Sequence, residues 1–125
     1  MKYLCLIYNE EKSVYAMPPE ALDAVAGECV AFDETLKQHG QFIACERLQP
    51  VSAATTIRIR EGKVSVTDGP FAETKEQLAG FYLIEARDLN DAIRVASKIP
   101  PGRLGCVEVR PVWEYKAQAI NRSDR

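Results

Sequence analysis

Residues 67–76 read Thr-Asp-Gly-Pro-Phe-Ala-Glu-Thr-Lys-Glu, and the rest of the chain is organised around this stretch. Asp68-Gly69-Pro70 predicts a turn, because glycine permits a positive φ and proline fixes its own φ and donates no backbone hydrogen bond. Phe71 follows as an apolar ring that we expect to be buried and to anchor the turn. Three charges and a hydroxyl then fall within residues 73–76, a mixture that favours a functional site over a plain connection.

Strand patterns lie on both sides of this turn. Residues 55–60 alternate between threonine or isoleucine on one face and threonine or arginine on the other, and residues 63–67 return with Val64 and Val66 expected to point inward. Glu61-Gly62 between them predicts a tight hairpin turn. Residues 3–8, 41–45, 80–86 and 106–112 supply further strands, and Pro111 places its end of the last strand either at an edge or beyond the ladder.

Two helices are expected. In residues 20–39, apolar side chains recur at spacings of three and four and form one stripe, made of Leu22, Val25, Cys29, Phe32 and Leu36. The charged residues of this helix, Asp33 among them, are expected to face water. Asp88 predicts the N-cap of the second helix, with Asp91 three positions on. Its buried face is expected to contain Leu89, Ala92, Ile93 and Ala96. Residues 9–19 read as a polar loop.

The order strand, helix, strand, hairpin, strand, helix, strand predicts an α+β fold, with one antiparallel-rich sheet and both helices on one face. Several strands are apolar on both faces, so the face without helices needs a cover. A second copy of the chain is the natural one, and we therefore predict a homodimer with the sheets facing each other. We expect a single domain over residues 1–125, with a polar tail at 114–125 whose last few residues fray.

Composition excludes several classes of partner. The net charge is −2 and the pI is about 5.5, which provides no basic field for a nucleic-acid backbone. No apolar run approaches the roughly 20 residues that span a bilayer. The apolar N-terminus is not followed by a small-residue cleavage site. We expect no direct nucleic-acid binding, no membrane association and a cytoplasmic location.

Cysteine and histidine limit the metal chemistry. The four cysteines have no Cys-x-x-Cys pair, so a structural zinc site is disfavoured and free, mostly buried thiols are expected. His39 is the single histidine, which excludes sites that need two histidine ligands. Its place in the last turn of a helix favours a C-terminal cation rather than a catalyst. With no metal, nucleotide or flavin motif, we expect no cofactor.

One family shares the central stretch. The Asp68-Gly69-Pro70-Phe71 string, the late Glu108-Val109-Arg110-Pro111, and the intervening Glu73, Lys75, Glu76 and Gly80 resemble the DGPF-motif branch of the YCII-related family over nearly the whole chain. The resemblance implies a ferredoxin-like α+β fold that dimerises as an α+β barrel. Most members of the branch have no established activity. Some similar genes lie beside those of extracytoplasmic-function sigma factors, and one relative in the broader family is a dehydrochlorinase acting on a chlorinated aromatic. The broader family often carries a His–Asp pair with the histidine early in the first helix, and here Cys29 stands near that place.

The candidate site residues cluster after the turn. The candidate catalytic residues are Asp68, Glu73 and Lys75, and the candidate ligand-binding residues are Thr74, Glu76, Arg110 and Arg47. Asp68 can act as a base, or it can cap backbone amides in the turn. The following charges can form a pocket or a solvated cluster. Arg110 can bind a carboxylate ligand, or it can form a structural ion pair with Glu108.

Two functions stay open from the sequence. The first is a cofactor-free lyase or dehydrohalogenase, in which Asp68 or Glu73 takes a proton and a nearby cation stabilises the developing negative charge. The second is a non-catalytic ligand-binding or regulatory module that binds a small organic acid or contacts a sigma-factor-type partner. An enclosed cavity lined by Asp68, Lys75 and Arg110 would favour the first.

Overall fold

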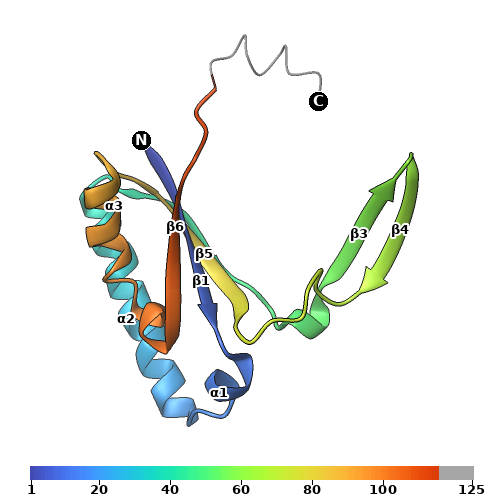
Figure 1. Cartoon of the computed structure of the whole chain (residues 1–125). Coiled ribbons are helices and arrows are strands. Elements are labelled where there is room, and N and C mark those ends of the chain that lie inside the picture. Colours follow the sequence, from blue (N-terminus) through green and yellow to red (C-terminus); the bar gives the residue numbers. More distant parts are fainter. Residues whose placement is uncertain (116–125) are drawn as a thin grey trace.

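A computed structural model describes residues 1–115, and its body is a four-stranded antiparallel sheet (Figure 1). The strands are β1 (Lys2–Asn9), β2 (Phe42–Arg47), β5 (Gln77–Glu85) and β6 (Gly105–Pro111). Their order is β2-β5-β1-β6, so β6 is an edge strand, and Pro111 lies within its ladder opposite Tyr3, which is the first of the two predicted alternatives. The α+β prediction is confirmed. Most of the predicted tail, residues 116–125, lies outside the described residues.

Two helices cover one face of this sheet. Helix α2 (Pro19–Gln38) connects β1 to β2, and α3 (Leu89–Ala96) connects β5 to β6 (Figure 1). Proline at the first position of α2 costs no helix hydrogen bond, and Gly40 just beyond its end has a φ of +68°, which a glycine adopts without strain. Both helices pack on the same sheet face, as the sequence pattern predicted.

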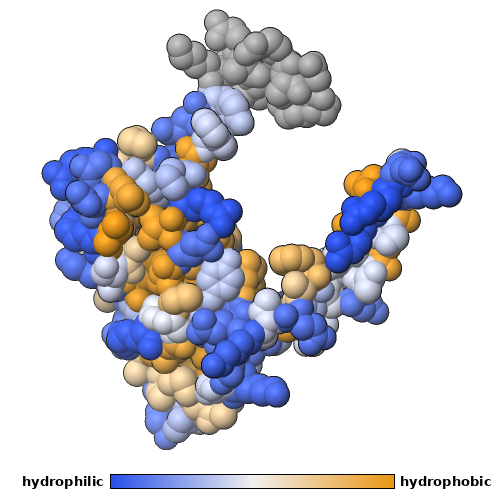
Figure 2. All heavy atoms as spheres, viewed as in Figure 1, coloured by the Kyte–Doolittle hydropathy of each residue, from blue (hydrophilic) through white to orange (hydrophobic). Residues whose placement is uncertain are grey.

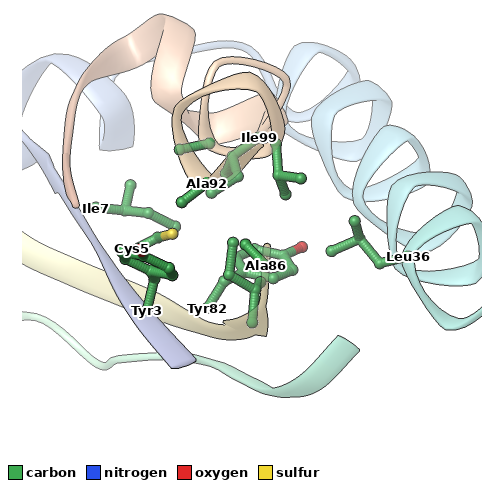
Figure 3. Close-up of a cluster of buried hydrophobic side chains, with 11 residues drawn as sticks. Tyr3, Cys5, Ile7, Leu36, Tyr82, Ala86, Ala92 and Ile99 are labelled. Atoms are coloured by element: carbon green, nitrogen blue, oxygen red, sulfur yellow. The ribbon is translucent and has the colours of Figure 1, made fainter. Parts of the chain in front are cut away.

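The core lies between these helices and the sheet, and Figure 3 shows its side chains meeting from β1, β5, α2 and α3. Alternate residues of β1 and β5 point into it: Tyr3, Cys5, Ile7, Tyr82 and Ile84. The intervening residues lie on the opposite face of the sheet. There Leu4 pairs with Leu83 and Leu6 with Phe81, and all four stay partly exposed. The strands are thus apolar on both faces, as expected.

Residues 9–19 are not simply a polar loop, and this prediction was wrong. They contain the short helix α1 (Glu11–Tyr15), which buries Val14. The backbone N–H of Glu11 donates to Gln77 Oε1 at 2.9 Å, and the Glu11 carboxylate accepts from the Val51 N–H at 2.9 Å. Two 3-10 helices, η1 (Val51–Ala53) and η2 (Pro100–Leu104), were also missed. Elements of about one turn are too short to show an apolar stripe.

The buried face of α3 differs from the predicted one. Ala92 and Ala96 are buried, but Leu89 and Ile93 are about half exposed. Asp91 and Val95 take the inward positions instead. The carboxylate of Asp91 is stabilised there because nearby N–H groups donate to it. The predicted N-cap is confirmed, since the Asp88 side chain accepts from the Asp91 N–H at 2.9 Å.

Strands β3 (Thr55–Arg60) and β4 (Lys63–Asp68) form a separate two-stranded sheet, so the prediction of one sheet was wrong. We call this projecting hairpin the arm (Figure 1). Its Glu61-Gly62 turn is confirmed by φ angles of +52° and +77°.

The apolar side chains of the arm are not covered by the described residues. Val64 and Val66, expected to point inward, are each 64% exposed. They pair directly with Ile59 and Ile57, which are 65% and 61% exposed. Figure 2 shows apolar residues, in orange, along the projecting arm. All four belong to one face of the hairpin, because residues two apart share a face.

Candidate functional site

The predicted turn is present at the base of the arm. Gly69 has a φ of +101°, and its N–H donates to the Ala54 carbonyl at 2.7 Å. The Thr56 hydroxyl donates to the Gly69 carbonyl at 2.8 Å. Asp68 ends β4 and is exposed. Phe71 is 77% exposed, so the prediction that it is a buried anchor is wrong for the single chain.

The charged residues after the turn face solvent. Glu73, Thr74, Lys75 and Glu76 are all exposed. The Thr74 hydroxyl donates to the Glu76 carbonyl, and Gln77 Nε2 donates to the Thr74 carbonyl at 2.7 Å, so the segment is held by its own backbone. Among residues 1–115, neither Glu73 nor Lys75 forms an ion pair.

The two predicted arginines have different surroundings. Arg110 forms an ion pair with Glu108, which the sequence left as one of two alternatives, and Glu108 also accepts from the Tyr8 hydroxyl at 3.3 Å. The hydrogen bond from Arg110 lowers the pKa of Glu108. Arg47 lies over the ring of Tyr15, 6.0 Å from its centroid, and lines a cavity. Asp68, Lys75 and Arg110 are not among the residues that line this cavity.

The cavity lies between α2 and the helix-covered face of the sheet and has a volume of about 270 Å³. Its apolar wall comes from α1, α2, β1 and η2, with Val14, Leu22, Val25, Ile7 and Leu104 among its residues. The apolar stripe of α2 explains its position. Leu36, near the end of the helix, is buried against the sheet, whereas Leu22, Val25 and Cys29 stay partly exposed because they line this space.

A carboxylate, a phenol and a thiol meet at one wall of the cavity. Asp33 of α2 accepts from the Tyr82 hydroxyl at 2.5 Å through one oxygen and from the Cys45 thiol at 3.7 Å through the other. Burial and the hydrogen bond to Asp33 raise the pKa of Tyr82, so it remains a phenol donor. Burial and the charge of Asp33 also raise the pKa of Cys45 and Cys29. Protonated thiols are poor nucleophiles, so thiolate chemistry is disfavoured here.

Asn9 supplies an unpaired polar group to the same cavity. It ends β1, is only 6% exposed and lines the cavity. Within residues 1–115 no buried polar side-chain atom is left without a hydrogen-bond partner, so the Asn9 amide, which has no protein partner there, keeps its polar atoms accessible to solvent. The amide of Asn9 is therefore available to a molecule that enters the cavity.

The YCII-related domain matches residues 1–116 of this chain, from β1 to beyond β6. The chain belongs to the YCII-related family. This YCII-related protein is also similar to an uncharacterised protein of Rhizobium meliloti (strain 1021). The two are 39% identical over 118 residues, which cover 93% of this chain and 95% of that protein. The family resemblance predicted from the sequence is confirmed, and neither comparison assigns an activity.

The cavity-lining polar residues of this YCII-related protein that sequence reasoning missed are Asp33, Tyr82 and Asn9. The expectation that Asp33 faces water was wrong, because its carboxylate lies against Tyr82 and the cavity. A signal was present, since Asp33 lies four residues after Cys29 and so borders the apolar stripe of α2. Nothing local marks Tyr82, which reads as an ordinary strand residue, or Asn9, which was read as the start of a polar loop.

The expectation of four free thiols is confirmed, with Cys5 buried, but Cys106 is exposed rather than buried. Burial raises the pKa of Cys5 to about 11. Within residues 1–115, no group of three or more His, Cys, Asp or Glu side chains is placed to hold a metal ion. None of the helices in that range is long and apolar enough to cross a membrane.

Proposed function

We propose that this YCII-related protein binds a small organic molecule in the cavity between α2 and the sheet. The observation that carries the proposal is Asn9, a residue only 6% exposed that lines this cavity and whose side-chain amide has no protein partner within residues 1–115. The mainly apolar wall with a few polar groups is typical of ligand sites, which usually measure about 300–1,000 Å³. At about 270 Å³ this cavity suits a molecule smaller than most cofactors.

The chemistry that best suits the site is acid–base catalysis by a carboxylate, as in a cofactor-free lyase or dehydrohalogenase. Asp33 is the carboxylate at the cavity, and the Tyr82 hydroxyl orients it. This assignment moves the proposed base from Asp68 or Glu73 to Asp33. A non-catalytic module would bind the same molecules without converting them, so product analysis on each bound compound separates the two.

Binding is tested by a fragment screen with amide chemical-shift mapping on the full chain. We expect bound fragments to shift the amides of Asn9, Cys29 and Tyr82. Cys29→Phe fills the cavity and should abolish this binding, whereas Ala24→Phe adds the same ring to the exposed side of α2 and should leave it intact. Fragments that bind both variants equally, or shift only amides outside the cavity, would remove the proposal.

We further propose that two copies assemble as the ferredoxin-like α+β barrel that the DGPF motif implies. The antiparallel order β2-β5-β1-β6 supports the ferredoxin-like topology, because each long helix connects two strands that flank a third. The apolar arm and the partly exposed sheet face support an assembly. Asp68, Glu73, Lys75 and Arg110 keep a proposed role only where a second copy approaches them. The four free cysteines support a cytoplasmic location.

A further inference from the structure

We infer that the cavity selects an uncharged or cationic ligand, one that donates a hydrogen bond to Asp33 from a hydroxyl or amino group, and that it rejects carboxylic acids. This inference rests on the proposed function and adds the chemical class of the ligand. It replaces the small organic acid that the sequence left open.

The charges around the cavity favour this class. Glu11 and Asp33 are the acidic residues on the cavity side of the lining, against the single guanidinium of Arg47, whereas Glu46 pairs with Phe81 on the opposite face of the sheet. Arg47 is exposed and lies over the Tyr15 ring, so water screens its charge. Asp33 is partly buried, where its field is screened less. A ligand carboxylate at the Asp33 wall would meet a like charge, and an ammonium group would meet an opposite one.

The hydrogen-bonding groups point to the same class. The Tyr82 hydroxyl and the Cys45 thiol both direct their protons to Asp33, so they offer no donor to a ligand. Each carboxylate oxygen accepts more than one hydrogen bond, and Asp33 therefore keeps acceptor capacity. The cavity wall at Asp33 therefore presents hydrogen-bond acceptors, and a ligand that binds there must supply the donor. The Asn9 amide both donates and accepts, so it tolerates a second polar group of either kind.

The rest of the lining specifies the body of the ligand. Leu22, Val25 and Leu104 line the space together with Ile7 and Val14, and only an apolar group replaces water there without losing hydrogen bonds. A small ring that carries one short polar side group fits a cavity with one polar wall and otherwise apolar walls. Suitable probes are 2-phenylethylamine, 2-phenylethanol and phenylacetate, which share a ring and a two-carbon arm and differ in charge.

The test titrates each probe into the full chain and follows the amide shifts of the cavity residues. We expect the amine and the alcohol to bind at least about tenfold more tightly than phenylacetate. Asp33→Asn should weaken amine binding about tenfold and leave phenylacetate unchanged or improved. Asp23→Asn, an exposed change on α2 outside the cavity, should change neither.

Tyr82→Phe provides a second variant that keeps the carboxylate. It removes one donor from Asp33, so amine affinity should be retained or raised. Cavity shifts that are strongest with phenylacetate would overturn the ligand class and leave small-molecule binding intact. If none of the three probes shifts a cavity amide up to its solubility limit, the proposed ligand class is refuted. If the fragment screen also finds no molecule that binds in the cavity, the proposed function is refuted as well.

Discussion

Asp91 is a charged residue in the position of a core residue. Its side chain is 3% exposed, and it accepts from the Arg87 backbone N–H at 3.0 Å, the Arg94 guanidinium at 2.8 Å and Gln41 Nε2 at 3.4 Å. The backbone N–H of Arg87 first, and then Arg94, hold the pKa of Asp91 well below its ordinary range. The carboxylate thus joins α3 to the loops at its start and to the beginning of β2.

Asp91→Asn should destabilise the protein by about 2 kcal/mol at neutral pH, because charged hydrogen bonds are replaced by weaker or mismatched ones. A lowered folded-state pKa contributes stability above the unfolded pKa of about 3.9, and this contribution is lost as the pH falls below it. The wild type should therefore lose more stability than the variant between about pH 5 and pH 3. Urea unfolding of the wild type and the variant from neutral pH to about pH 3 measures the loss of stability and its pH dependence. Parallel pH curves for the two proteins would contradict the assignment.

At the scale of single residues, the sequence correctly predicted the roles of residues whose partners are near in the chain. The Asp88 cap, the Glu61-Gly62 turn and the Gly69 turn were all correct because their geometry depends on adjacent residues. Asp33 was missed because Tyr82, its partner, lies 49 residues away. A lone acidic residue in a helix reads as solvent-exposed until the fold shows which groups meet it.

Strand β6 approaches β1 so closely at its first residue that only glycine fits. A Cβ built on Gly105 would lie 1.9 Å from the Tyr8 carbonyl oxygen, far inside any van der Waals contact. Its φ of −173° is ordinary extended backbone, so the requirement is space and not conformation. Gly27, on the exposed side of α2, has no atom within 4 Å of a built Cβ.

Gly105→Ala should therefore cost about 2–3 kcal/mol, since β6 must move away from β1. Gly27→Ala should instead stabilise the protein by about 0.5–1 kcal/mol, because alanine is the better helix former. Thermal and urea unfolding of the two variants compares an identical chemical change in two settings. A neutral Gly105→Ala would show that β6 is not held at this register.

Elements with a long repeat were predictable, and short ones were not. The stripe from Leu22 to Leu36 identified α2 within one residue at each end. The same reasoning was only half right for the buried face of α3: Ala92 and Ala96 are buried as predicted, but Leu89 and Ile93 are not, because they fit the period as well as Val95 does. Apolar spacing identifies a helix reliably, but hydrogen bonds to Asp91 decide which side of α3 is buried.

At the scale of the whole molecule, the arm is the part whose apolar face is not covered by the rest of the described chain. Two-stranded hairpins are marginally stable alone in water. This one carries four β-branched side chains on one face, each more than 60% exposed. The partly exposed sheet face of the same chain offers an apolar surface that has no cover within the described residues. The homodimer stays a prediction, and the arm provides the place to test it.

Val66→Lys puts a charge on the apolar face of the arm and should convert dimers to monomers. Ser65→Lys adds the same charge to the opposite face, where Ser65 pairs with Arg58, and should leave the dimer intact. Light scattering and sedimentation over a dilution series measure the mass of both variants. A wild-type chain that is a folded monomer at all concentrations would refute the dimer.

The error at this scale was to place residues 55–68 in the main sheet. Their alternating pattern is the same in a central strand and in a free hairpin, because both have two faces. The pattern correctly assigned Ile57 and Val66 to one face. Only the path of the chain from β2 through η1 shows that the hairpin β3–β4 forms a separate sheet and does not join the four-stranded one.

The arm also offers Arg58, Arg60 and Lys63 beside its exposed tip. Trypsin-like proteases need such a basic residue in a segment that opens easily, and a lone hairpin opens at little cost. We expect a solitary copy to be nicked within the arm while its body survives, and a paired copy to resist. The fraction of chains cut within the arm would then report the fraction of monomers. Cellular proteases would degrade unpaired monomers before dimers.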